Sequence, residues 1–369
     1  MALRASKPSF NVREKLTELA VKFGLKGSEL AKAETVQDAR DIIGAGRRNL
    51  CINGNFKCWQ RGTSIAGGAT GNSSNTYKYV TADRWQTYFY NSYARQDVVL
   101  PNGEKVYALR ETFNVTRNFF AHIIEDGGRI WNQGGDITIS FWARTSGKTT
   151  GVSLGFYWYD DWAGSAYTHD APRENIIIEG SEWKHYSVTK KLSTNANNRA
   201  NLAIEFDNNN YGSWSQLTSG EYWEFANIQI EKGSVATDFE HRSIGEELAL
   251  CQRYYQKIYY NTSDYPFGYC YTYNQSASAC TVPLPTNMRG EASSIDVVNC
   301  NIRGSNQDGV NNGYTVTSFT YATDNGITKG LCQLNIAHNI TNSSNIGAAS
   351  VLTNGVSNVT SYIAIDAEL

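Results

Sequence analysis

The sequence has no long apolar run. Because no stretch of 18 or more apolar residues occurs, we expect no membrane-spanning helix and no membrane insertion. The N-terminal residues MALRASKPSFNVREKL lack the apolar core of a secretory signal, so we also expect no such signal. Charge is scarce: charged residues make up 18% of the chain, and 33 lysines and arginines nearly cancel 35 aspartates and glutamates. No basic field is therefore predicted to hold nucleic acid.

Motifs for metal binding and for common enzyme chemistry are missing. The five histidines show no HxH, HExxH or HxxxH spacing, which argues against a His-based metal site. GVSLG at residues 151–155 has the letters GxSxG, but it lies inside a strand-like run and not at the strand-to-helix turn of a nucleophile elbow. There is no GxxxxGK[ST] phosphate loop and no GxGxxG fingerprint. The seven cysteines form no CxxC pair. This predicts buried thiols made in a reducing compartment, with no disulfide framework and no structural zinc.

Paired carboxylates remain as a route to catalysis, because glycosidases need two acids about 5 to 10 Å apart. The candidates are Asp160, Asp161, Glu174 and Glu179. Loop carboxylates are more often solvated or cap turns, so we predict no catalytic residue and no enzyme. Carboxylates in such loops also suit Ca²⁺, which takes about six to eight oxygen ligands. We therefore expect no cofactor, with a structural Ca²⁺ ion as the open alternative.

Residues 1–48 show helical rather than β spacing. Val12, Leu16, Leu19 and Phe23 recur on one side of a predicted helix. Helices this small bury little surface alone, so the segment needs a partner or neighbouring copies. We interpret it as a docking segment; the alternative is a cap packed on its own body.

From residue 49 to 240, short alternating runs are separated by Gly, Asn, Asp and Ser, which is typical of an all-β sandwich. In ITISFWA, residues 137–143, one sheet face is apolar and Trp142 lies on the other. Predicted strands are bounded as follows: Asn49 to Ile52, Arg84 to Tyr90, Lys105 to Phe113, Ile137 to Ala143, Val152 to Tyr159, Trp183 to Leu192, Asn201 to Phe206 and Tyr222 to Glu231.

Residues 241–260 predict a connecting helix. Leu248, Cys251, Tyr255 and Ile258 repeat at steps of three and four residues, which gives one apolar face that must be covered. Domain packing and a trimer seam are both open explanations. Residues 261–369 return to strand-like runs separated by DGVNNG, TDNG, TNSSN and LTNG, so we expect a C-terminal β-sandwich tip, with a barrel as the alternative.

The stretch GFYWYDDWAGSAYTHD, residues 155–170, places aromatic rings beside carboxylates. A flat ring covers the apolar face of a sugar while Asp, Asn and His bind its hydroxyls. Core or intersubunit packing is the alternative, because aromatic residues are mostly buried. The glycan-binding candidates are Tyr157, Trp158, Tyr159, Asp160, Asp161 and Trp162, with Tyr211 and Trp214 in a second turn-rich loop.

Several stretches occur in an order that resembles tail-fibre proteins of tailed bacteriophages. They are NLCINGNFKCWQRGTS from Asn49, TADRW from Thr81, ITISFWARTSG from Ile137, and YWEFANIQIEKGSVATDFEHRSIGEELALCQRYYQK from Tyr222. VPLPTNMRG and the terminal YIAIDAEL are similar to the C-terminal ends of the same group, and residues 8–50 to fibre N-termini of short-tailed, cyanophage-like phages. The resemblance implies a carbohydrate-binding-like jelly roll and a homotrimer, and it transfers no catalytic residue.

Together these observations predict a mainly β virion fibre that docks on the phage particle through its N-terminus and binds a host cell-surface glycan. Such a protein is assembled in the host cytoplasm and released by lysis, which fits the missing signal. Its partners would be other virion proteins of the tail or capsid. An architectural tail adaptor or head fibre without receptor binding is the alternative. A polysaccharide depolymerase, in which Asp160 or Glu179 would matter, is a further one.

Overall fold

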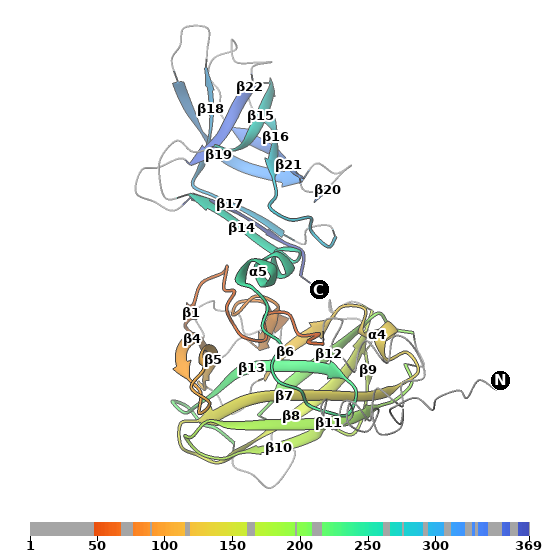
Figure 1. The fold of residues 1–369 in the computed structure, drawn as a ribbon. Helices are drawn as coiled ribbons and strands as arrows, with labels where there is room; N and C mark the ends of the chain where they lie inside the picture. The colour runs from red at the N-terminus through yellow and green to blue at the C-terminus, as the bar shows by residue number, and fades with distance from the viewer. Residues whose placement is uncertain are drawn as a thin grey trace, which may run out of the picture.

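The computed structural model describes fifteen stretches of the chain, which form two β regions joined by one helix (Figure 1). The predicted mainly β fold is therefore confirmed. Val12, Leu16, Leu19 and Phe23 of the predicted docking segment lie outside the described residues. The described residues are 48–67, 77–88, 91–114, 119–160, 167–195, 198–208, 216–260, 266–274, 277–290, 294–305, 311–321, 327–328, 331–338, 349–354 and 361–368.

The N-terminal region is a jelly-roll sandwich of two antiparallel sheets. The chain crosses between the sheets at each of β6, β7 and β8, which is why neighbours in a sheet are distant in sequence. Sheet 1 has the order β1 (Ser64–Ile65), β4 (Ser92–Val99), β5 (Lys105–Thr112), β13 (Tyr222–Lys232), β7 (Gly135–Thr145) and β11 (Lys184–Leu192). Sheet 2 has the order β10 (Glu174–Ile178), β8 (Thr150–Tyr159), β12 (Asn201–Asp207), β6 (Phe119–Ile124), β3 (Trp85–Tyr88) and β2 (Tyr77–Lys78), and β9 (Thr168–His169) pairs with β8. A short helix α4 (Gly127–Ile130) follows β6.

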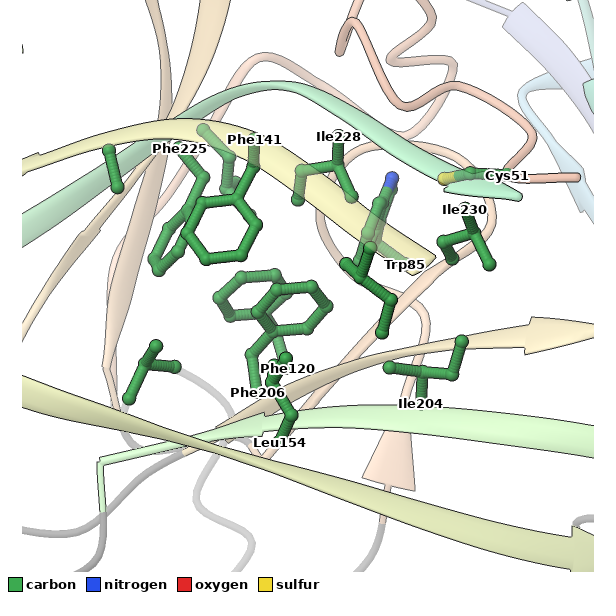
Figure 2. Close-up of a cluster of buried hydrophobic side chains, with 14 of the residues drawn as sticks. Cys51, Trp85, Phe120, Phe141, Leu154, Ile204, Phe206, Phe225, Ile228 and Ile230 are labelled. Atoms are coloured by element: carbon green, nitrogen blue, oxygen red, sulfur yellow. The ribbon is translucent and has the colours of Figure 1, made fainter. Parts of the chain in front are cut away.

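Aromatic side chains fill the space between the two sheets (Figure 2). Phe120 and Phe206 stack with ring centroids 4.8 Å apart, and Phe225 meets Phe120 edge-on at 5.0 Å. Burial of each such ring contributes about 1.5–3 kcal/mol. The alternation predicted in β7 is confirmed: Phe141 is buried in this core, while Trp142 lies on the other face of the sheet.

The predicted strand Asn49 to Ile52 is wrong. These residues form no strand. The Asn49 side chain occupies backbone N–H groups that a regular strand pairing would use. Its Oδ1 accepts hydrogen bonds from the backbone N–H groups of Cys51 (2.9 Å) and Ile230 (3.1 Å). A side chain that bonds its own neighbourhood in this way competes with ladder pairing.

The connecting helix α5 (Ile244–Gln252) is shorter than predicted. It begins at Ile244, where the Ser243 hydroxyl caps it by accepting from the Glu246 N–H at 3.2 Å. Two residues after it the run YQKIYY forms strand β14 (Tyr255–Tyr260), because aromatic and β-branched residues favour strands and β23 is available to pair with it. No helix among the described residues is long and apolar enough to cross a membrane.

This correction divides the four residues predicted for a trimer seam. Leu248 and Cys251 lie on α5, but Tyr255 and Ile258 lie on β14, so the four do not share one helical face. Cys251 and Tyr255 are already buried within a single chain. The homotrimer itself stays a prediction.

The C-terminal region also has two sheets. Sheet 3 has the order β14, β23 (Ser361–Asp366) and β17 (Ser294–Val298). Sheet 4 has the order β16 (Ala277–Pro283), β15 (Pro266–Asn274), β22 (Ala349–Asn354), β18 (Cys300–Ser305), β19 (Asn311–Tyr321), β21 (Leu331–His338) and β20 (Ile327–Thr328). An additional pairing of β16 with β21 closes a ring of strands within sheet 4.

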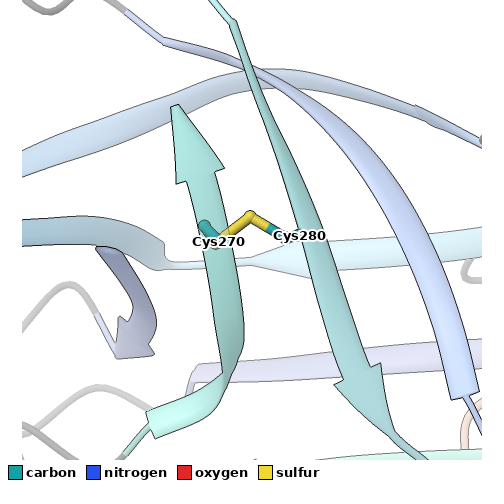
Figure 3. The surroundings of a disulfide bond; sticks show 2 residues. All are labelled: Cys270 and Cys280. Atoms are coloured by element: carbon teal, nitrogen blue, oxygen red, sulfur yellow. A yellow bond between two sulfur atoms is a disulfide. The ribbon is translucent and has the colours of Figure 1, made fainter. Parts of the chain in front are cut away.

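A disulfide corrects the expectation that the cysteines stay reduced. Cys270 and Cys280 lie opposite each other on β15 and β16 and are bonded (Figure 3). The sequence did not reveal the pair because antiparallel pairing, rather than a short motif, brings the two residues together. Cys51, Cys58, Cys251 and Cys300 are free and buried, as predicted for the set as a whole.

The end of the chain returns to the N-terminal region through a charged latch formed by Arg61, Arg84, Asp366 and Glu368. Arg61 Nη2 lies 2.8 Å from Asp366 Oδ2, and Arg84 pairs with Glu368. The Arg84 guanidinium also stacks on the Tyr254 ring, with Cζ 3.5 Å from its centroid. These contacts place the base of the C-terminal region against the sandwich, beside α5 (Figure 1).

Candidate functional site

Strand β8 sends the predicted aromatic candidates to opposite faces of sheet 2, because successive strand residues alternate. Trp158 is 1% exposed and belongs to the core between the sheets, where its Nε1 donates to Asp170 at 3.2 Å. Tyr157 and Tyr159 lie on the outer face with Ala121, Ile123 and Ala203. Trp158 is therefore a structural residue, whereas the two tyrosines belong to the outer face.

The remaining candidates are separated from this cluster or lie outside the described residues. Asp160 is exposed and forms an ion pair with Arg199, with Nη1 and Oδ2 2.8 Å apart. Four of the predicted candidates lie outside the described residues: Asp161, Trp162, Tyr211 and Trp214.

An open depression of about 540 Å³ lies on the outer face of sheet 2, and we call it the tyrosine pocket. Tyr157 on β8 stacks on His169 of the paired strand β9, with ring centroids 4.8 Å apart. Tyr167 meets Tyr157 edge-on at 5.5 Å and is 59% exposed. The pocket is lined by Tyr157, Tyr167, His169, Pro172, Arg173 and Asn175.

Arg173 fixes the floor of the tyrosine pocket. Its guanidinium pairs with Glu205 and lies 3.6 Å from Asp207, and it donates a hydrogen bond to the Tyr157 hydroxyl. Burial disfavours the charged form, but Glu205 and the other partners outweigh it and raise the Arg173 pKa. Gly155 makes room for this group, since a Cβ there would lie 2.8 Å from Arg173 Cζ. The cation is therefore permanent and held in place.

His169 is the titratable ring at the pocket wall. Partial burial lowers its pKa, and the nearby charges of Arg173 and Lys190 lower it further. At pH 7 the imidazole is neutral, so one ring nitrogen donates and the other accepts a hydrogen bond. This suits a ligand that carries hydroxyl groups.

Of the carboxylates predicted as candidates for an acid pair, Glu179 is held by an ion pair on the exposed surface. The ion pair with Lys184 lowers the pKa of Glu179, which keeps it ionised and unsuited to act as a general acid. Among the described residues, burial raises the pKa of Asp83 to about 6, but that residue is fully buried beside Arg61 and Gln60. No group of three or more His, Cys, Asp or Glu residues in the described ranges is placed to hold a metal ion.

Tyr157 is the one lining residue that was named as a candidate from the sequence; the others are Tyr167, His169, Pro172, Arg173 and Asn175. Tyr167 and His169 lie within the aromatic stretch 155–170, whereas no local pattern pointed to Arg173. Its partner Glu205 is 32 positions away and reaches it only because β8 lies between β10 and β12. The aromatic stretch around Tyr157 was the available sequence signal for this site. It identified strand β8 but not the Arg173–Glu205 ion pair.

Comparisons with known proteins give structural likenesses only. No protein-family model matches the chain, and no curated protein matches it. The CBM22-2 xylan-binding domain from Paenibacillus barcinonensis Xyn10C is 15% identical, with 45% of this chain and 97% of that one covered and a TM-score of 0.29. A family 11 carbohydrate-binding module from Clostridium thermocellum, in complex with a mixed-linked tetrasaccharide, is 14% identical, with 42% and 91% covered and a TM-score of 0.28.

One further likeness is to the enzymatically active domain of tailspike protein 4 from bacteriophage CBA120. It is 15% identical, with 46% of this chain and 21% of that one covered and a TM-score of 0.28. Scores this low support no conclusion about the ligand of this chain.

Proposed function

We propose that this chain is a non-catalytic glycan-binding protein and that the tyrosine pocket is its sugar site. The observation that carries the proposal is the exposed ring of Tyr167 beside the Tyr157–His169 stack and the fixed cation of Arg173. An exposed ring covers the apolar face of a pyranose, and neutral His169 with Asn175 binds its hydroxyls. The carboxylates near the pocket are engaged by arginine, which fits binding rather than hydrolysis.

We further propose that the chain is a phage virion fibre, a homotrimer that docks on other virion proteins and binds a host cell-surface glycan. The ordered stretches that resemble tail-fibre proteins support this role. In a multi-copy particle, weak single-site affinities add through effective concentration. A shallow, open pocket is therefore sufficient for adsorption to a cell.

The sugar site is tested by binding of the labelled full-length chain to a printed array of bacterial surface glycans. Tyr167→Ala removes the exposed ring and should weaken single-site binding by about fivefold, since such ring contacts contribute about 1 kcal/mol. Tyr269→Ala is the matched control, because Tyr269 is 74% exposed but lies on β15. Unchanged binding of Tyr167→Ala to every bound glycan would overturn the assignment. Reducing ends released from a bound glycan would instead favour the depolymerase.

A second candidate function is architectural. Tyr269 and Tyr271 are exposed side chains on one face of β15, at 74% and 56%. Exposed aromatic residues of this kind are enriched at protein interfaces. If the chain binds virion proteins through this face and no glycan, the Tyr269→Ala control becomes the informative variant in a virion-assembly assay.

A further inference from the structure

A second depression, of about 340 Å³, lies on sheet 1 and carries chemistry that the tyrosine pocket does not use. It lies between β4, β5 and β13 and the loop before β1, whereas the tyrosine pocket lies on sheet 2. We call it the asparagine pocket. Its lining includes Asn55, Lys57, Glu104, Asn227 and His241.

The backbone brings Asn55 and Asn227 to this pocket. The Ile228 N–H donates to the Gly54 carbonyl at 2.8 Å, so the residues flanking this bond are neighbours. Gly54 is required for the contact, because a Cβ would lie 2.0 Å from the Ile228 carbonyl oxygen. Asn227 sits in a β-bulge with φ of 49°, a left-handed conformation that Asn tolerates.

Each asparagine has one buried polar atom with no hydrogen-bond partner in the part of the chain that the structure describes. Both residues are 3% exposed. The Asn55 Oδ1 accepts from the Lys57 N–H at 3.3 Å, which leaves Nδ2 as a donor. The Asn227 Nδ2 donates to the Glu104 carboxylate at 3.3 and 3.4 Å, which leaves Oδ1 as an acceptor. Buried donors and acceptors without partners are rare, because a buried polar group that makes no hydrogen bond destabilises the fold.

The charges of the pocket select against an ionic ligand. Lys57 and Lys105 balance Asp97 and Glu104, and His241 Nε2 lies 3.2 Å from Glu104 Oε1. The unpartnered Asn55 N–H would also oppose a metal ion. A hydroxyl group is the neutral function that donates and accepts at one atom.

We propose that the asparagine pocket binds one ring of a neutral sugar, independently of the tyrosine pocket. A ring hydroxyl donates to Asn227 Oδ1, and a hydroxyl oxygen accepts from Asn55 Nδ2. The aliphatic side chains of Val98 and Val106 cover the apolar face of the ring. The chain therefore has sugar sites on both sheets.

The test uses the full-length Tyr167→Ala chain, in which the tyrosine pocket is impaired. Ligand-observed NMR measures binding of glucose, galactose, mannose and N-acetylglucosamine, each up to about 100 mM, well above a millimolar dissociation constant. Adding Asn227→Gly removes the acceptor and keeps the backbone conformation, because Gly favours positive φ. We expect binding of at least one sugar, weakened about tenfold or more by Asn227→Gly.

The matched control is Asn198→Gly, since Asn198 is exposed and has a φ of 50°. It should bind as tightly as its parent. Failure of all four sugars to bind, or equal binding with and without Asn227→Gly, overturns this proposal. Loss with Asn227→Gly supports it even if Tyr167→Ala has no effect on the glycan array, so the two proposals fail separately.

Discussion

In the N-terminal region the largest buried side chains are aromatic, whereas the buried apolar side chains of β16, β17 and β23 are aliphatic or cysteine. The first region has a core in which Phe120, Phe206 and Phe225 contact one another. The second is supplemented by the Cys270–Cys280 disulfide and by the charged latch. The sandwich thus has a large aromatic core of its own, while the described part of the C-terminal region adds a cross-link and charged contacts with its neighbour.

The largest effect should come from Phe206→Ala. Removing a ring from the centre of the aromatic stack leaves a cavity and should lower the free energy of unfolding by about 3–5 kcal/mol. Denaturant unfolding followed by tryptophan fluorescence measures the change. Ile177→Ala on the same sheet is the control, because Ile177 is 51% exposed and should change stability by less than about 0.5 kcal/mol. Similar losses for both variants would contradict the assignment of the core.

Removal of the disulfide should have a smaller and local effect. Cys270→Ala with Cys280→Ala opens a link between residues ten positions apart, which should cost about 2–3 kcal/mol. Amide hydrogen exchange should accelerate in β15 and β16 and stay unchanged in β7 and β12. Faster exchange throughout the sandwich would show that the two regions unfold together, against the comparison drawn above.

The smallest effect is a dependence of the stability of the N-terminal region on pH. His122 is fully buried against Trp85, with centroids 4.9 Å apart, and burial lowers its pKa well below the ordinary value. The unfolded chain binds a proton near pH 6.5 and the folded chain does not. Stability is therefore complete above about pH 6.5 and falls by about 1.4 kcal/mol per pH unit below it.

The measurement compares the free energy of unfolding of the wild type and His122→Gln from pH 7 to pH 5. The raised pKa of Asp83 acts in the opposite direction, since its carboxyl prefers the protonated form in the folded chain. That contribution is common to both proteins and cancels in the difference. Parallel pH profiles of the two proteins would refute a neutral, buried His122.

The sequence predicted those features that depend on local pattern. Alternation placed Phe141 in the core, and the apolar repeat that includes Leu248 and Cys251 located helix α5 within residues 241–260. It did not predict features that depend on strand order. The end of α5 was missed because pairing with β23 recruits Tyr255 into a strand. Likewise, neither Arg173 with Glu205 nor Asn55 with Asn227 is close in sequence, and both pairs meet only in the folded sheets.

The place of β23 in sheet 3 sets an order of events during synthesis. This strand lies between β14 and β17, about 100 residues after the first of them, so it leaves the ribosome later than both. The sandwich has all its strands by residue 232 and can complete its core while translation continues. β14 and β17 must wait, without their shared neighbour, until β23 emerges and Asp366 and Glu368 reach Arg61 and Arg84. The latch can therefore form only after β23 and the residues that follow it have been made.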